Sequence, residues 1–137
     1  MTLSAPRTAT PHHAAHRAGT VSPADQATLW EMEEQFWTSG PENARATTAT
    51  NAVMVFSYPP GILQGDQIWN HLRDRTGWRT VRLGERRIMR CEDIAILTYR
   101  VSAEKPDVPV TKALCASTYL HDEGSWLRIA HQQTPVT

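Results

Sequence analysis

The sequence predicts an α+β fold, in which a curved antiparallel sheet carries three helices on its concave face. Two observations predict this arrangement. Apolar residues recur at helical spacing in segments 22–38 and 65–75, with a weaker helix signal at 43–49, and after Gly77 an alternation of period two continues almost to the end of the chain. A β-branched and aromatic run at 51–58 adds a strand between the second and third helices. At 137 residues, the chain has the length of a single domain.

The first helix carries a clear start signal. Ser22 is a suitable N-cap, Pro23 fits the first helical position, and Asp25 provides the acid of a capping box. The predicted apolar face consists of Leu29, Met32, Phe36 and, on the flank, Trp37. The remaining, solvated face is expected to carry the acidic residues Glu31, Glu33 and Glu34. The pattern is typical of an amphipathic helix lying on a sheet.

The second half of the chain predicts a meander of four strands. The alternating segments are 78–90, 93–103, 110–121 and 125–134, and the short polar turns CED, EKPDVP and DEG join them. The helix at 43–49 is weakly signalled. The helix at 65–75 carries Ile68, Trp69 and Leu72 at helical spacing.

Composition excludes several classes of protein. Fourteen basic residues balance fourteen acidic ones, which favours neither nucleic acid nor an anionic membrane as a partner, and no apolar run reaches a membrane span. Cys91 and Cys115 lie in apolar runs without metal-ligand spacing, which favours buried free thiols over a disulfide and predicts a cytoplasmic location. No metal or cofactor motif is present. Residues 1–20 lack acidic residues and contain few large apolar ones, so we expect a flexible tail before a domain at 21–137, with a transit peptide as the alternative.

A family resemblance is carried by three features: the element order, the string MVFSYPPG followed by QGDQIW, and the ending WLRIAHQQTP. With these, residues 22–135 resemble the NTF2-like (cystatin-like) superfamily, and the ending is similar to that of the DUF4440 group of SnoaL-like small proteins. The resemblance implies a cone-shaped α+β barrel with a pocket in the cone, commonly assembled as a homodimer. It implies no single activity, because members include isomerases, cyclases, dehydratases and non-catalytic binding domains.

Side-chain parity predicts the lining of this cone. On the last strand, Arg128 is expected to lie on the outer face of the sheet together with Trp126 and Gln132. Ten residues are then expected to line a largely apolar ligand pocket with a few polar tips: Trp37, Met54, Phe56, Tyr58, Trp69, Leu97, Tyr99, Ile129, His131 and Gln133. The alternative is that the aromatic side chains form an ordinary core. In that case His131 is a core histidine, or lies at the frayed end of an edge strand.

The candidate catalytic group is His131, with Tyr99 or Tyr58 as hydrogen-bond donor to a developing oxyanion. In the ketosteroid isomerases of the superfamily that the chain resembles, an acidic residue precedes a Pro-x-Gly turn and serves as the base. Here Tyr58 precedes Pro59-Pro60-Gly61, which disfavours that chemistry. We therefore expect a protein that binds a small hydrophobic molecule, as a possible lyase, isomerase or cyclase. A non-catalytic dimerisation or protein-interaction module is the alternative, and the sequence does not decide whether the chain is an enzyme.

Two features of the predicted surface are an apolar stripe and a cluster of arginines. Ile94, Ile96 and Trp126 are expected to form an outward apolar stripe that a second subunit covers. Seven arginines lie between Arg73 and Arg90, and their alternation favours a solvated face, paired with Glu31, Glu33, Glu34 and Glu85, over a site for an anionic partner.

Overall fold

The computed structural model describes residues 19–73 and 78–136. Its elements are α2 (Pro23–Thr38), α3 (Pro41–Ala46), β1 (Thr48–Val55), β2 (Ile62–Gln64), α4 (Asp66–Leu72), β3 (Thr80–Cys91), β4 (Ile94–Lys105), β5 (Val108–Asp122) and β6 (Ser125–Pro135). The predicted order is confirmed, and β2 is a short strand that the sequence analysis did not anticipate. Of the predicted tail at 1–20, residues 1–18 lie outside the described part of the chain.

The strands form one six-stranded sheet in the order β2-β1-β6-β5-β4-β3. The pairs from β3 to β6 are antiparallel hairpins, as the short turns require, while β1 pairs with β6 in parallel. The chain returns to β1 only with its last strand, after the hairpins of β3, β4 and β5, and β6 then runs parallel to β1. Within the turn between β1 and β2, Gly61 has φ 85°, a value that a residue without a Cβ adopts most readily.

The helix α2 begins as predicted, since the Ser22 side chain accepts a hydrogen bond from the Asp25 backbone N–H at 3.1 Å. Its buried residues are Leu29, Trp30, Glu33 and Trp37. The predicted solvent exposure of Glu33 is wrong: its exposed fraction is 0%. The apolar face of the helix therefore contains a carboxylate.

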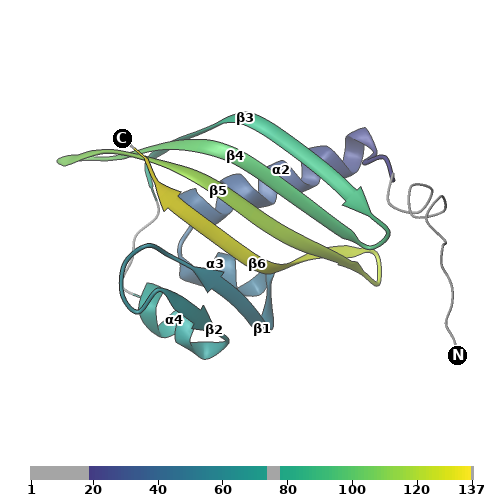
Figure 1. The fold of residues 1–137 in the computed structure, drawn as a ribbon, viewed down its shortest axis with the longest axis horizontal. Helices are drawn as coiled ribbons and strands as arrows, with labels where there is room; N and C mark the ends of the chain where they lie inside the picture. The colour runs from purple at the N-terminus through teal and green to yellow at the C-terminus, as the bar shows by residue number, and fades with distance from the viewer. Residues whose placement is uncertain (1–18, 74–77, 137) are drawn as a thin grey trace, which may run out of the picture.

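Two apolar clusters make up the core. The larger one joins α2 to the inward residues of β3 to β6, and the smaller one joins β1 to α3 and α4. Figure 1 shows α2 crossing the sheet behind β3 to β6, with α3 and α4 grouped beside β1 and β2. Phe36, near the C-terminal end of α2, packs against both clusters. The two halves of the molecule thus meet at this end of the helix.

The predicted orientations of the first half of β6 are wrong, because the strand contains a β-bulge. Thr118 pairs with Ala130 while the next residue, Tyr119, pairs with Arg128, so Ile129 is an extra residue on β6. Trp126 and Arg128 are consequently buried on the inner face. Ile129, predicted to line the pocket, is partly exposed and belongs to neither core cluster.

Beyond the bulge, the predicted orientations agree with the burial. His131 is buried and Gln132 is exposed. The strand continues to Pro135, so a frayed end before residue 131 is excluded. Within the described part of the chain, no helix has the length and apolar character needed to cross a membrane.

Candidate functional site

A buried polar cluster centred on Glu33 lies between α2 and the sheet. Three hydroxyl groups donate hydrogen bonds to its carboxylate: Tyr99 and Ser117 to Oε2, and Tyr119 to Oε1 at 2.6 Å. The Tyr99 hydroxyl in turn accepts a hydrogen bond from Trp37 Nε1 at 2.9 Å. Strands β4 and β5 supply these donors because their inward residues at this level are hydroxyl-bearing instead of aliphatic.

Arg128 is the counter-charge of Glu33. Both side chains are fully buried, and Arg128 Nη2 lies 3.7 Å from Glu33 Oε1. The guanidinium also donates to Tyr119 Oη at 2.6 Å, Thr48 Oγ1 at 3.0 Å and the Met32 carbonyl at 3.2 Å. These contacts tie β6 to β5, to β1 and to α2. A buried ion pair is tolerated where further hydrogen bonds satisfy most of the polar atoms of both groups. Among the described residues, Arg128 Nε is the buried side-chain atom that has no hydrogen-bond partner.

His131 connects the cluster to the end of β6. Its Nδ1 lies 2.7 Å from Ser117 Oγ and 3.5 Å from Glu33 Oε2, and its Nε2 lies 3.0 Å from Gln133 Oε1. The ring is tilted over Phe36, with 4.6 Å between the ring centroids. His131 is therefore a buried histidine with a partner on each nitrogen, and one of those partners reaches toward solvent.

The carboxylate of Glu33 is ionised in the folded protein. Burial raises its pKa, but the hydrogen bond with His131 and the charges of Arg128 and His131 outweigh burial and hold the pKa well below its ordinary value of 4.5. A carboxylate held this strongly in its ionised form is a weak base at neutral pH. Glu33 therefore organises the cluster and is poorly suited to abstract a proton.

The neighbouring hydroxyl and thiol groups shift the other way. Burial and the charge of Glu33 raise the pKa values of Tyr99 and Tyr119 well above 10, and burial raises the pKa of the Cys115 thiol to about 12. These groups thus keep their protons. Both phenols remain hydrogen-bond donors to Glu33.

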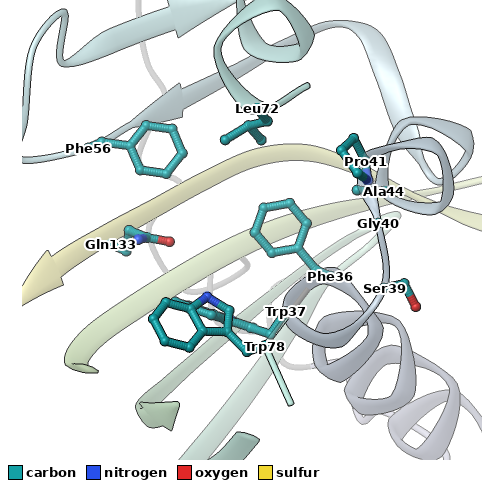
Figure 2. A pocket seen from close by; sticks show the side chains of 10 residues that line it. All are labelled: Phe36, Trp37, Ser39, Gly40, Pro41, Ala44, Phe56, Leu72, Trp78 and Gln133. Carbon is teal, nitrogen blue, oxygen red and sulfur yellow. The ribbon is translucent and has the colours of Figure 1, made fainter. Parts of the chain in front are cut away.

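A cavity of about 50 Å³ lies beside this cluster, at the junction of the two apolar clusters. Figure 2 shows the rings of Phe36, Phe56 and Trp78 and the amide of Gln133 directed toward the same space. The full lining is Phe36, Trp37, Ser39, Gly40, Pro41, Ala44, Phe56, Leu72, Trp78 and Gln133. The cavity is mainly apolar, with four aromatic side chains, and the Gln133 amide in its lining is hydrogen-bonded to His131.

The structure brings together part of the predicted site. Trp37, Phe56 and Gln133 line the cavity, and His131 stands behind Gln133. Four predicted residues are buried but absent from the lining: Met54, Trp69, Leu97 and Tyr99. Tyr58 is half-buried, stacked on Phe56 and His71, and also absent from the lining.

Sequence reasoning missed Glu33, Ser117, Tyr119 and Arg128. A signal for Glu33 was present: at about 100° per residue, Leu29, Trp30, Phe36 and Trp37 span an arc of about 120°, and Glu33 lies in its middle. Arg128 had no comparable signal, because nothing in the composition of β6 marks the bulge at Ile129. Within residues 19–73 and 78–136, no group of His, Cys, Asp or Glu side chains is arranged to hold a metal ion.

No protein-family model and no curated protein matches the sequence. Solved structures do match it. A candidate ketosteroid isomerase of Parabacteroides distasonis superposes with a TM-score of 0.72 at 14% identity, over 89% of this chain and 96% of that chain. An NTF2-like protein of unknown function from Pseudomonas putida gives 0.67 at 14%, over 84% and 89%. A candidate Ca/calmodulin-dependent kinase II association domain of Exiguobacterium sibiricum gives 0.68 at 15%, over 87% and 98%.

These likenesses establish the fold. The chain has the NTF2-like (cystatin-like) α+β architecture, a curved open sheet with helices on one face, as the sequence predicts. At such low identities, they transfer no activity. The finer resemblance to the DUF4440 and SnoaL-like group remains a prediction.

We predict that Glu33→Gln lowers the free energy of unfolding by about 3–5 kcal/mol, because it leaves the buried Arg128 without its counter-ion. Urea denaturation measures this loss. Glu34→Gln is the matched control on the exposed side of the same helix, where the contact with Arg86 is 3.9 Å, and it should change stability by less than about 0.5 kcal/mol. Equal, small effects of the two changes would show that Glu33 contributes nothing special.

The stability of the wild type should also depend on pH through Glu33. Its folded pKa lies below the unfolded value, so the stabilisation is present above about pH 4.5 and is lost as the pH falls below that value. Between about pH 4.5 and 3, the wild type should lose about 1.4 kcal/mol per pH unit more than Glu33→Gln does. Urea denaturation of both proteins at a series of pH values gives the two curves, and parallel curves would refute this assignment.

Proposed function

We propose that this protein binds a small, largely apolar molecule in the cavity at the C-terminal end of α2. The observation that carries the proposal is the combination of a largely apolar lining, which includes four aromatic side chains, with the polar side chains of Ser39 and Gln133. Of these two, Gln133 is hydrogen-bonded to the buried His131. Apolar walls with a few convergent polar groups are typical of small-molecule sites.

The size of the cavity narrows the class of ligand. Its volume of about 50 Å³ is well below the roughly 300–1,000 Å³ of sites for drug-sized ligands. The buried side chains around Glu33 fill the space between α2 and strands β4 to β6. The proposal therefore favours a single-ring or short-chain compound over a steroid.

Within the proposed site, His131 is the best candidate for acid–base chemistry, because Nε2 faces Gln133 and Gln133 lines the cavity. Tyr99 is less suited to act on a ligand, since its hydroxyl already donates to Glu33 and accepts from Trp37. Lyase, isomerase or cyclase activity, with Tyr58 or Tyr99 as donor, remains a prediction. A location in the cytoplasm remains one too.

Binding is tested by the tryptophan fluorescence and melting temperature of the protein against single-ring acids, alcohols and amides, with steroids for comparison. We expect single-ring compounds to raise the melting temperature and steroids to have no effect. Gln133→Leu should weaken the binding of polar members of the set about tenfold, because a hydrogen bond worth about 1 kcal/mol or more is lost. Gln132→Leu, at the exposed neighbouring position, is the control. No response to any small ring would refute the proposal.

A second function, self-association, is supported by the outer face of the sheet. Met89 and Ile96 are register partners there, as are Ile94 and Leu120, and Met89 and Leu114 are 47% and 44% exposed. An apolar patch of this kind is typical of an interface. Trp126 is not part of it, because the bulge in β6 turns that side chain to the inner face, where it is buried.

We expect light scattering to give about twice the chain mass of 15.4 kDa for the wild type. Ile96→Glu should give the single-chain mass, because it places a charge within the patch. Ser102→Glu, nearer the other end of β4, should leave the wild-type mass unchanged. A wild-type mass of 15.4 kDa in dilute solution would contradict this second function.

A further inference from the structure

The chain of hydrogen bonds from His131 through Ser117 to Glu33 determines which imidazole nitrogen carries a fixed proton. An ionised carboxylate only accepts, and Glu33 Oε2 lies 2.5 Å from Ser117 Oγ, so the Ser117 proton is directed to Glu33. Ser117 Oγ must then accept a hydrogen bond from its other partner, His131 Nδ1, at 2.7 Å. Nδ1 is therefore protonated whether the ring is neutral or charged. Any change of protonation falls on Nε2.

Nε2 faces the amide of Gln133, which can present either its oxygen or its nitrogen. If Nε2 carries a proton, it donates to Gln133 Oε1 at 3.0 Å, and the amide nitrogen of Gln133 can then donate to a ligand in the cavity. If Nε2 carries no proton, the Gln133 amide must turn so that its nitrogen donates to Nε2. The amide oxygen then faces the cavity and can accept a hydrogen bond from a ligand. The polarity that Gln133 presents to a ligand thus follows the proton on Nε2.

The surroundings favour a ligand that accepts hydrogen bonds. No side chain that lines the cavity within the described chain carries a charge. Lys105 Nζ lies 4.5 Å from the centre of the Trp78 ring, which forms part of the lining, and so adds positive charge beside that wall. The titratable and charged groups packed around or near His131 are Glu33 on α2, Tyr99 on β4, Cys115 and Tyr119 on β5, Arg128 on β6, and His71 on α4 beyond Phe56.

We infer that Glu33, acting through Ser117, is a positioning residue that confines proton exchange of His131 to Nε2, so that a small carboxylate binds the amide nitrogen of Gln133 with uptake of one proton. The inference rests on the proposed function and names the ligand class of that site. The proton comes from the solvent and adds to the Nε2 lone pair, and no bond of the ligand is broken. The resulting imidazolium offsets the charge of the carboxylate.

The test uses the full-length wild type with propionate and benzoate, each against its neutral amide, propionamide or benzamide. Long-range ¹⁵N–¹H spectra identify the protonated nitrogen, and His131→Gln assigns the signal. At a pH where the ring of the free protein is neutral, we expect its proton on Nδ1, and we expect added carboxylate to place a second proton on Nε2. On the alkaline side, the dissociation constant of the carboxylates should rise about tenfold per pH unit, since one proton is taken up, and that of the amides should stay constant.

Two variants separate positioning from folding. Ser117→Ala should allow the proton of the neutral ring onto either nitrogen, while Ser117→Thr, which keeps the hydroxyl, should preserve Nδ1–H. If Ser117→Ala does not fold, the wild-type spectra still decide. An Nε2–H tautomer in the free wild type, or equal and pH-independent binding of acids and amides, overturns the inference but leaves small-molecule binding standing. If neither the acids nor the amides bind, the inference is overturned. If the wider set of compounds also gives no response, the proposed function is refuted as well.

Discussion

The burial of one carboxylate in the middle of α2 is the constraint on which the rest of the interior depends. A charged group with no exposed surface is tolerated only where other groups neutralise and hydrogen-bond it. Glu33 obtains three hydroxyl donors from β4 and β5 and a guanidinium from β6. The helix is therefore held to the sheet at one angle and one register, since a slip of either would leave a buried charge without its partner. Apolar contacts alone would define that register less sharply.

The same constraint explains the bulge in β6. A regular strand that turns His131 inward would place Arg128 on the outer face, as strict alternation predicts. One extra residue, Ile129, lets both side chains face inward, so that the guanidinium reaches Glu33 and the imidazole reaches Ser117. The irregularity thus allows the last strand to provide both the counter-ion and the histidine. It also places Gln133 at the cavity, two residues beyond His131.

Most of the fold could be predicted from the sequence, because it follows from local periodicity and capping: the Ser22 cap, the two prolines after β1 and the turns of the meander act over a few residues. The orientations along β4 were likewise predictable, since its alternation is uninterrupted and Leu97 and Tyr99 are buried as expected. The centre of the site could be predicted only in part. Glu33 was assigned to the solvent because charge outweighed its position on the helix, and Arg128 because a bulge leaves no mark in composition. His131 and Gln133 were identified because they interrupt an apolar alternation.

The central claim is that Glu33 and Arg128 act as one buried ion pair. A double-mutant cycle with Glu33→Gln and Arg128→Met, followed by urea denaturation, measures their coupling directly. The account predicts strong non-additivity: each single change leaves a buried group without its partner, so the double variant should be more stable than the sum of the two single losses implies, by about 2 kcal/mol or more. Additive losses, with a coupling energy below about 0.5 kcal/mol, would contradict it.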